Sequence, residues 1–259
     1  MVLAIDIGNS NVVIGLSDDK SWPYLLRLPT QNEKDALFYY ETRLTNYLFE
    51  EQIKPEQLTK AVISSVVPDL RSMFEELVVH LFKIRPVIVA PPIYDKFHLK
   101  IDNPTEIGTD LLANAVAAHY RFKQGVIIVD FGTALTFTVV NAQGHILGVN
   151  IAPGLKTAIS ALFNKTAQLP EVPLELPRSV IGKNTVHAIQ SGVLVGYIGL
   201  VKHMLHQIRM ELGEQFIAVA TGGLSSILEP LHDEFQEVDL NLTLNGLKKI
   251  VELVEESPP

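Results

Sequence analysis

Two stretches of the chain carry the same pattern of apolar and polar positions. Each is an apolar run of strand length that ends in aspartate, followed by a glycine-containing turn and a second apolar run: VLAIDIGNSNVVIGL at residues 2–16 and VIIVDFGTALTFTVV at residues 126–140. Short apolar runs bounded by turn residues predict buried strands. Each stretch therefore predicts a strand, a tight turn and a second strand. Because the second stretch begins about halfway along the chain, we interpret the pair as an internal duplication.

The remaining segments predict the same order of elements in both halves. The first half predicts strands at 2–7, 11–17, 24–29, 61–67 and 87–90, and helices at 33–52, 69–82 and 105–122, the last with Thr105 as a candidate N-cap. The second half predicts strands at 126–130, 135–141, 146–151, 216–220 and 235–238, and helices at 155–163, 184–212, 224–232 and 244–255. We therefore expect two similar α/β domains, residues 1–123 and 124–259, each ordered βββαβαβα, with a cleft between them. Ligands of α/β folds bind at the carboxyl ends of the strands.

Composition narrows the classes of ligand and location. Hydrophobic residues make up 47% of the 259 residues and charged residues 19%, which is ample for a packed core. The formal net charge of −8 argues against a nucleic-acid or anionic-membrane partner, since both demand basic surfaces. The absence of cysteine excludes disulfides and zinc–thiolate sites. The N-terminus has no basic region typical of a signal peptide, and no uninterrupted apolar run reaches the roughly 20 residues that span a bilayer. We expect a cytoplasmic protein.

The two glycine turns are candidate phosphate sites. Glycine permits positive φ and close approach of backbone N–H groups to phosphate oxygens, as the turns Gly8-Asn9-Ser10 and Gly132-Thr133 would allow. Asp6 and Asp130 would then lie beside a polyphosphate, where a cation between the negative groups is the natural solution. The alternative is that each aspartate only caps its turn. The occurrence of the pair favours the functional interpretation.

Three further segments have residues suited to a ligand site. Thr221-Gly222-Gly223 follows a predicted strand and would approach the adenosine side of a nucleotide. Asp110 lies early in an otherwise apolar, alanine-rich helical pattern, either as a partner of the helix dipole or as a catalytic base, and Gly108 leaves room for a substrate. The residues 148–154 form a strand that ends in a Pro-Gly turn. The chain has no G-x-x-x-x-G-K-[ST] and no G-x-G-x-x-G motif, which argues against P-loop and Rossmann enzymes.

These motifs, in this order, resemble a known family. The duplicated strand–turn–strand is similar to that of the acetate and sugar kinase/Hsp70/actin superfamily. More closely, DIGNS (6–10), SSVVP (64–68), DNPTEIGTD (102–110), DFGTALT (130–136), GVNIAPG (148–154), TAQLP (166–170), Thr185 with QSG (190–192), and TGG (221–223) resemble type III pantothenate kinase over nearly the whole chain. The resemblance implies two ribonuclease H-like (actin-like ATPase) domains. It also implies ATP-dependent phosphorylation of pantothenate to 4′-phosphopantothenate, the first step of coenzyme A synthesis, in a homodimer that requires Mg²⁺ and a monovalent cation, K⁺ or NH₄⁺.

The resemblance also implies a role for each site residue. Asp110 matches the general base, and Asp130 matches the aspartate that binds the monovalent cation. The ATP-binding residues would be Asp6, Gly8, Asn9, Ser10, Asn11, Val12, Val13, Thr133, Gly222 and Gly223. The pantothenate-binding residues would be Gly108, Thr109, Asp110, Leu111 and Thr185, the last contributed by the dimer partner or by the same chain. Asp6 would hold Mg²⁺ through water.

The chain departs from the family pattern at position 111. The family's G-x-D-R segment reads Gly108-Thr109-Asp110-Leu111, so a leucine replaces a cation with five fixed donors. Three hypotheses follow: an active pantothenate kinase, which we favour; a catalytically weak relative with a regulatory or binding role; and a kinase of the same superfamily for another small hydroxylated substrate. An actin- or chaperone-like ATPase is less consistent with the chain, which is too short for the extra subdomains.

Overall fold

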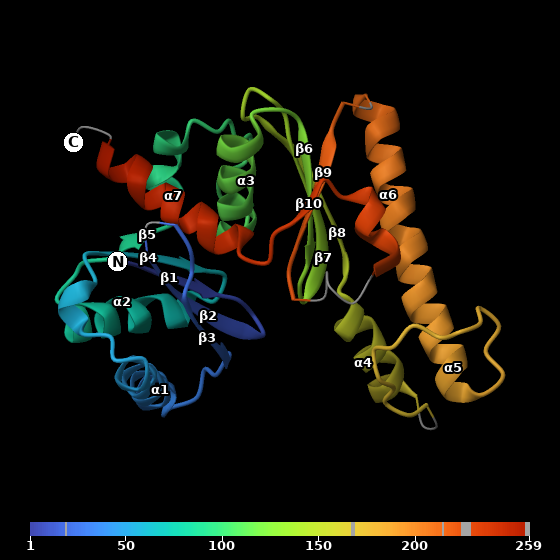
Figure 1. The fold of residues 1–259 in the computed structure, drawn as a ribbon, viewed down its shortest axis with the longest axis horizontal. Coiled ribbons are helices and arrows are strands. Elements are labelled where there is room, and N and C mark those ends of the chain that lie inside the picture. The colour runs from blue at the N-terminus through green and yellow to red at the C-terminus, as the bar shows by residue number, and fades with distance from the viewer. Residues whose placement is uncertain (19, 167–168, 214, 224–228, 257–259) are drawn as a thin grey trace. The chain divides into compact units, whose positions relative to one another are not determined.

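The computed structural model describes residues 1–18, 20–166, 169–213, 215–223 and 229–256. Contacts between Cα atoms divide the chain into two compact units. The first unit comprises Met1–Tyr120 and Asn241–Pro259, and the second comprises Arg121–Leu240. Each unit is described by itself below, with the element labels of Figure 1.

The first unit is built on a five-stranded mixed sheet. Its strands lie in the order β3-β2-β1-β4-β5, with the bounds Tyr24–Pro29, Asn11–Ser17, Val2–Ile7, Lys60–Ser65 and Val87–Ile88. The central strand β1 pairs antiparallel with β2 and parallel with β4. Because side chains alternate across a strand, Leu3, Ile5 and Ile7 enter the hydrophobic core on one face, whereas Asp6 lies on the other.

Helices cover both faces of this sheet. Figure 1 shows α1 (Ala36–Glu50) and α2 (Pro68–Phe82) on one face and α7 (Leu242–Glu256) on the other. Tyr40 and Leu44 of α1 and Phe74 of α2 are fully buried in the core below β1 and β2. Helix α7 lies against β1 and β4, and α3 (Thr109–Phe122) follows a short 3₁₀ helix at Pro91–Phe97.

The second unit repeats this sheet strand for strand. Its order is β10-β9-β6-β7-β8, with the bounds Glu237–Val238, Ile217–Thr221, Val126–Phe131, Ala134–Val140 and Ile146–Pro153. Strand β6 pairs antiparallel with β7 and parallel with β9, so it occupies the place of β1. Asp130 in β6 therefore corresponds to Asp6 in β1. The common topology agrees with the duplication expected from the sequence.

One face of the second sheet is covered by a long interrupted helix. The predicted helix at 184–212 consists of α5 (Thr185–Gln190), a π-helical segment at Ser191–Val195 and α6 (Gly196–Leu212). Leu194, Val201 and Leu205 are fully buried in its core. The shorter helix α4 (Leu155–Lys165) follows β8.

By length and composition alone, one described helix is apolar enough to cross a membrane. This helix is the stretch Thr185–Leu212, and 39% of its most apolar segment is buried. Uninterrupted apolar runs are short, as the sequence indicates, but the mean hydropathy of this stretch is high. Its buried face packs in the core of the second unit, as a core helix does, so this single helix is weak grounds for a membrane location.

Some predicted elements differ from the structure. Helix α3 begins at Thr109, so the prediction of a start at Thr105 is wrong. Residues 103–106 form a separate turn closed by the Glu106 N–H and the Asn103 carbonyl (3.1 Å), and Gly108 next to it disfavours helix. Most of the predicted helix at 224–232 lies outside the described residues, and Glu229–Glu234 is a 3₁₀ helix. The C-terminal helix α7 groups with the first unit, although the sequence order places it in the second half.

The contact between α7 and α3 leaves no room for a side chain at Gly246. A Cβ atom at this buried glycine would overlap the backbone carbonyl of Ala113. We expect Gly246→Ala to lower the free energy of unfolding by about 3 kcal/mol, because overpacking against a backbone group cannot relax cheaply. Denaturant unfolding followed by circular dichroism measures this change.

Glu252→Ala in the same helix is the matched control. Its carboxylate pairs with Lys249 at 3.0 Å on a partly exposed surface, so its removal should change stability by less than about 0.5 kcal/mol. Equal stability losses in the two variants would contradict the close contact of α7 with α3.

Candidate functional site

The first glycine turn is a short hairpin with its tip in solvent. It connects β1 to β2, and the Gly8 N–H donates to the Asn11 carbonyl at 2.9 Å. Thr30 braces the turn: its N–H donates to the Ser10 carbonyl (3.0 Å) and its hydroxyl to the Gly8 carbonyl (2.7 Å). Asn9 and Ser10 are exposed. Thr30 thus fixes the turn, while the exposed residues Asn9 and Ser10 remain accessible to a ligand.

The positive φ expected of glycine in the two hairpin turns is wrong. Among Gly8, Gly132 and Gly222, only Gly222 has a positive φ, of 91°. A Cβ at Gly8 would lie 3.2 Å from the Asn11 carbonyl oxygen, and one at Gly132 would lie 3.3 Å from the Ala134 carbonyl oxygen. In these tight turns glycine is favoured by the close approach of the backbone rather than by a left-handed conformation.

The candidate base Asp110 lies in the first turn of α3. Its Oδ1 accepts a hydrogen bond from the Leu111 N–H at 2.9 Å. Burial raises the pKa of Asp110 above its usual value, and the hydrogen bonds from the N–H groups of Leu111 and of Asp110 itself offset part of this rise. A Cβ at Gly108 would overlap Oδ1 of Asp110. Glycine at 108 therefore lets the carboxylate fold back over the start of the helix.

A serine that the sequence analysis did not select connects this helix to β1. The Ser64 hydroxyl lies 3.0 Å from Oδ1 of Asp6 and 2.9 Å from Oγ1 of Thr109. The first unit thus brings together three predicted site residues, Asp6, Thr109 and Asp110. Ser64 falls in the SSVVP segment (64–68) of the family resemblance and in a predicted strand, but its register with Asp6 could not be read from the sequence.

The second glycine turn is fixed to the start of α4. The Thr133 carbonyl accepts hydrogen bonds from the Gly154 N–H (3.0 Å) and the Thr157 hydroxyl (2.8 Å). A Cβ at Gly222 would lie 2.6 Å from Oδ1 of Asp130, so the Thr221-Gly222 segment lies directly against this carboxylate. The second unit therefore brings Asp130 and Gly222 together, with Thr133 exposed in the adjacent turn.

Hydroxyl groups flank Asp130 on the same face of its sheet. Asp130 is in register with Thr221 on β9 and with Thr136 on β7. The Thr136 hydroxyl is buried and has no hydrogen-bond partner in the described part of the chain, and the same holds for Thr138. A carboxylate with threonines in register on both neighbouring strands suits a cation of low charge, because carboxylate and neutral oxygens are the ligands that hard cations take. These residues fit the cation that the sequence implies.

The residues near Asp6 fit a magnesium ion that is held largely by substrate. No cluster of three or more His, Cys, Asp or Glu side chains with ligand geometry occurs in the described ranges. Mg²⁺ commonly uses one or two carboxylates together with substrate phosphates and water. A single carboxylate beside a phosphate-sized turn is consistent with that mode of binding.

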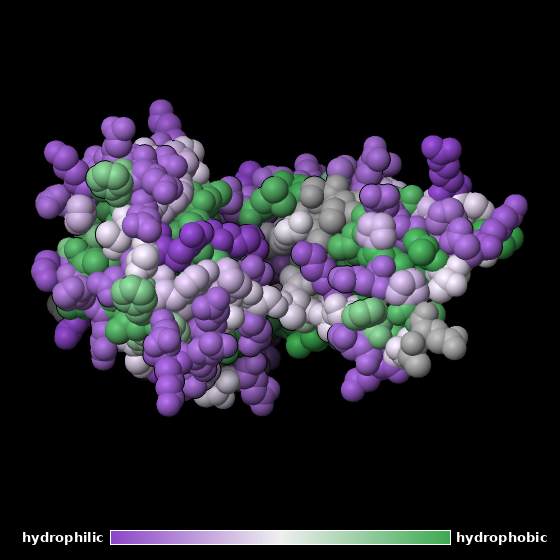
Figure 2. Space-filling view, turned by 90° about the horizontal axis from the view of Figure 1, so that it is seen from below, coloured by the Kyte–Doolittle hydropathy of each residue, from purple (hydrophilic) through white to green (hydrophobic). Residues whose placement is uncertain are grey.

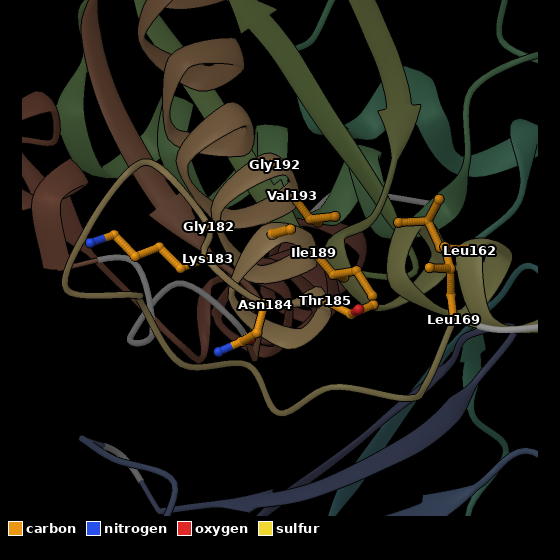
Figure 3. Close-up of a pocket in the computed structure, with 10 residues that line it drawn as sticks. Leu162, Leu169, Gly182, Lys183, Asn184, Thr185, Ile189, Gly192 and Val193 are labelled. Carbon is orange, nitrogen blue, oxygen red and sulfur yellow. The ribbon is translucent and has the colours of Figure 1, made fainter.

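Thr185 lies in a pocket of the second unit. The pocket has a volume of about 740 Å³ and is lined by α4, α5, the π-helical segment and the preceding loop. In Figure 3, Thr185 and Ile189 lie on the side of Leu162 and Leu169, whereas the side chain of Lys183 extends away from them. None of residues 108–111, the other predicted acceptor-binding residues, lines this pocket.

Apolar side chains are exposed on the segment that precedes this pocket. Val180 is 69% exposed and Ile181 is 77% exposed. The loop is fixed at its base, since Gln190 donates to the Pro173 carbonyl (3.0 Å) and the Ser191 hydroxyl donates to the Val180 carbonyl. Figure 2 shows hydrophobic surface interspersed with hydrophilic surface on one face of the protein.

Comparison with known proteins gives consistent results for sequence and fold. A model of the type III pantothenate kinase family matches residues 2–207. The type III pantothenate kinase of Citrifermentans bemidjiense is 40% identical over 255 residues, which cover 96% of this chain and 98% of the relative. That of Exiguobacterium sibiricum is 39% identical over 253 residues, covering 97% and 99%.

Solved structures extend the likeness in fold alone. The ethanolamine utilization protein EutJ from Carboxydothermus hydrogenoformans superposes with a TM-score of 0.54 at 15% identity, covering 95% of this chain and 88% of that one. MreB 5 of Spiroplasma citri, bound to AMPPNP, gives 0.53 at 10% identity, covering 98% and 97%. The predicted fold class is confirmed.

The raised pKa of Asp110 makes stability depend on pH. Because the folded-state pKa lies above the unfolded value of about 3.9, the folded protein binds this proton more tightly, and the stability so gained is lost as the pH rises through the folded-state pKa. Asp110→Asn removes the buried charge. We expect its melting temperature to exceed that of the parent chain at neutral pH, with a difference that shrinks towards acid pH.

Thermal unfolding over a pH series checks this sign. Asp95→Asn, at an exposed position in the same unit, is the control, and its difference from the parent chain should stay small at each pH. If Asp110→Asn is less stable than the parent chain at every pH, burial of the Asp110 carboxylate does not destabilise the folded protein and the expected sign is wrong.

Proposed function

The chain belongs to the type III pantothenate kinase family, and we propose that its own reaction is the ATP-dependent phosphorylation of pantothenate to 4′-phosphopantothenate. The observation that carries the proposal is the pair of aspartate–glycine turns at matching positions of two duplicated sheets, together with Asp110 at the start of α3. Asp6, Asp110, Asp130 and Thr185 all fall within the residues that the family model matches.

In this reaction the protein supplies positions and charges rather than covalent chemistry. The acceptor hydroxyl oxygen bonds to the γ-phosphorus, the bond from that phosphorus to the β-phosphate oxygen breaks, and ADP leaves. Asp110 orients the hydroxyl and accepts its proton. Burial suits this role, because a carboxyl whose pKa is raised towards the working pH is a stronger base while still ionised.

The two turns would bind the phosphates of ATP. Residues 6–13 would contact them with the backbone N–H groups at the exposed tip of the first turn, and Thr133 would add a contact from the second turn. Gly222 and Gly223 would lie on the adenosine side. Asp6 would hold Mg²⁺ through water, and Asp130 would bind K⁺ or NH₄⁺ with the adjacent Thr136 hydroxyl. When bound, these cations neutralise the charge that develops on the transferred phosphoryl group.

The acceptor side would be formed by residues 108–111 and Thr185. Thr185 lies in a pocket of the second unit and would be contributed by the same chain or by the partner of a homodimer. The exposed apolar loop at Val180 and Ile181 offers surface for such an interface. We propose that the enzyme acts in the cytoplasm, without a nucleic-acid or membrane partner.

Leu111 supports a second candidate function. It is half-buried beside Asp110 and presents no charge to an anionic acceptor. A regulatory or binding role with weak catalysis, or a different hydroxylated acceptor, would each be compatible with this leucine. The intact set of Asp6, Asp110 and Asp130 favours the active kinase.

A turnover assay separates these candidates. Purified protein is incubated with ATP, Mg²⁺ and K⁺, with and without pantothenate, and ADP release and the mass of the product are measured. We expect pantothenate-dependent ADP release and phosphopantothenate. Asp110→Asn should reduce kcat by about 10²–10⁴-fold, the usual contribution of a general base, while ATP binding is retained.

The opposite results are equally informative. ATP binding without pantothenate-dependent turnover would favour a regulatory protein or another acceptor. Leu111→Arg, which restores the family residue, would then be the first variant to measure. Unchanged turnover in Asp110→Asn would remove Asp110 from the role of base.

The buried hydroxyls of Thr136 and Thr138, which have no hydrogen-bond partner among the described residues, give a paired test of the cation site. Thr136→Val keeps the shape of the side chain and removes the hydroxyl in register with Asp130, and Thr138→Val does the same two residues further along β7, opposite Ile128. We expect only Thr136→Val to raise the K⁺ concentration needed for half-maximal activity, by about tenfold, the order expected for one lost oxygen ligand.

A binding readout accompanies the kinetics. The rise in melting temperature that K⁺ produces with ADP bound should shrink in Thr136→Val and persist in Thr138→Val. If both variants respond to K⁺ as the parent chain does, the Thr136 hydroxyl is not a cation ligand.

A further inference from the structure

Ser64 occupies a position at which the two sides of the first unit's candidate site meet. It lies in β4, in register with Asp6 of β1, and is fully buried. Its hydroxyl is 3.0 Å from the Asp6 carboxylate and 2.9 Å from the Thr109 hydroxyl. Asp6 belongs to the strand that leads into the phosphate turn, and Thr109 precedes the candidate base in α3. One oxygen atom therefore joins the strand of the phosphate turn to the helix of the base.

The direction of the hydrogen bonds in this chain is set by charge. An ionised carboxylate only accepts hydrogen bonds, so the Ser64 proton is directed to Oδ1 of Asp6. The Ser64 oxygen can then only accept from Thr109, whose own proton is committed to Ser64. The chain runs Thr109 to Ser64 to Asp6. On its remaining side, the Thr109 oxygen offers only lone pairs, which suit a hydroxyl donor on the phosphoryl acceptor.

The duplicated sheet contains the same arrangement a second time. Thr221 of β9 is in register with Asp130 of β6, as Ser64 of β4 is with Asp6 of β1. Thr221 is 1% exposed, and Ser64 is fully buried. Both sheets thus place a buried hydroxyl residue on the parallel strand beside the aspartate. A hydroxyl at this register is a property of the repeated unit rather than of one local turn.

We propose that Ser64 is a positioning residue of the phosphoryl-transfer site. By donating to Oδ1 it fixes the rotation of the Asp6 carboxylate, which would hold Mg²⁺ through water. By accepting from Thr109 it fixes the first turn of α3, and so the place of Asp110 relative to the phosphate turn. The part of this proposal that concerns turnover rests on the proposed function; the part that concerns metal–nucleotide binding does not.

Removal of single hydroxyls tests the chain. Ser64→Ala and Thr109→Val each delete one hydroxyl with little change of shape, and the double variant deletes both. We expect kcat to fall about tenfold in each single variant, the order expected for a lost hydrogen bond in a charge-assisted network. Because the two residues act as one unit, the double variant should fall about tenfold as well, rather than the hundredfold of independent sites.

Ser65→Ala is the matched control. Ser65 follows Ser64 directly, and its hydroxyl donates to the Val67 carbonyl at 2.7 Å without contacting Asp6 or Thr109. It should retain the kcat of the parent chain. Ser64→Thr keeps a hydroxyl at this position and should retain most of the kcat that Ser64→Ala loses. The second sheet has a threonine, Thr221, at the corresponding register.

A binding measurement separates this proposal from the proposed function. The affinity for ADP is measured by fluorescence titration over a range of Mg²⁺ concentrations. In Ser64→Ala the Mg²⁺ concentration for half-maximal enhancement of ADP affinity should rise several-fold, and in Ser65→Ala it should not change. This readout does not require pantothenate. If the parent chain fails to phosphorylate pantothenate, but Ser64→Ala still needs more Mg²⁺ than the parent chain for the same enhancement of ADP affinity, the proposed function fails and the role of Ser64 stands.

Three outcomes would overturn the proposal. The first is an unchanged Mg²⁺ response in Ser64→Ala. The second is a double variant whose loss equals the product of the two single losses. The third is a lowered melting temperature in Ser64→Ala with no change of kcat at a temperature where the variant is folded, which would make Ser64 a core serine only.

Discussion

A carboxylate at the end of a buried central strand is the constraint from which much of the site follows. Each sheet has an apolar strand at its centre whose second-to-last residue is an aspartate, Asp6 or Asp130. A charge in such a place requires hydrogen-bond donors or a cation, because desolvation otherwise costs several kcal/mol. In the first unit a buried serine on the neighbouring strand donates to it. In the second, a glycine with positive φ lets backbone lie against the carboxylate.

The two copies of this constraint have diverged in ways that match separate tasks. The antiparallel neighbour of Asp6 is Val13, whereas that of Asp130 is Thr136, whose hydroxyl has no partner in the described residues. The first aspartate is connected through Ser64 to the helix of Asp110. The second has threonines in register on both neighbouring strands of its own sheet. A common origin thus accounts for the similar strands, and single side chains across each strand account for the different surroundings of the two carboxylates.

Much of this could be predicted from the sequence, because the strands are short apolar runs and the aspartate–glycine turns repeat. The residues of the phosphate turns were apparent for the same reason, and Asp110 was apparent as a carboxylate in an alanine-rich helical pattern. Other features depend on tertiary context. Thr105 has the local chemistry of a helix cap, but the chain turns there and the helix begins at Thr109. Ser64 is one small polar residue in an apolar strand, and only strand register shows that it faces Asp6.

The grouping of α7 with the first unit has a consequence for how the protein is made. The sheet face against which α7 packs is composed of strands from the first 65 residues, while the helix is the last element of the chain. During synthesis this face lacks α7, and its apolar side chains stay without that cover until the entire second unit has been translated. Folding of the first unit is therefore completed only after α7 has been translated, so a product truncated before α7 exposes a hydrophobic face that a chaperone or protease can recognise.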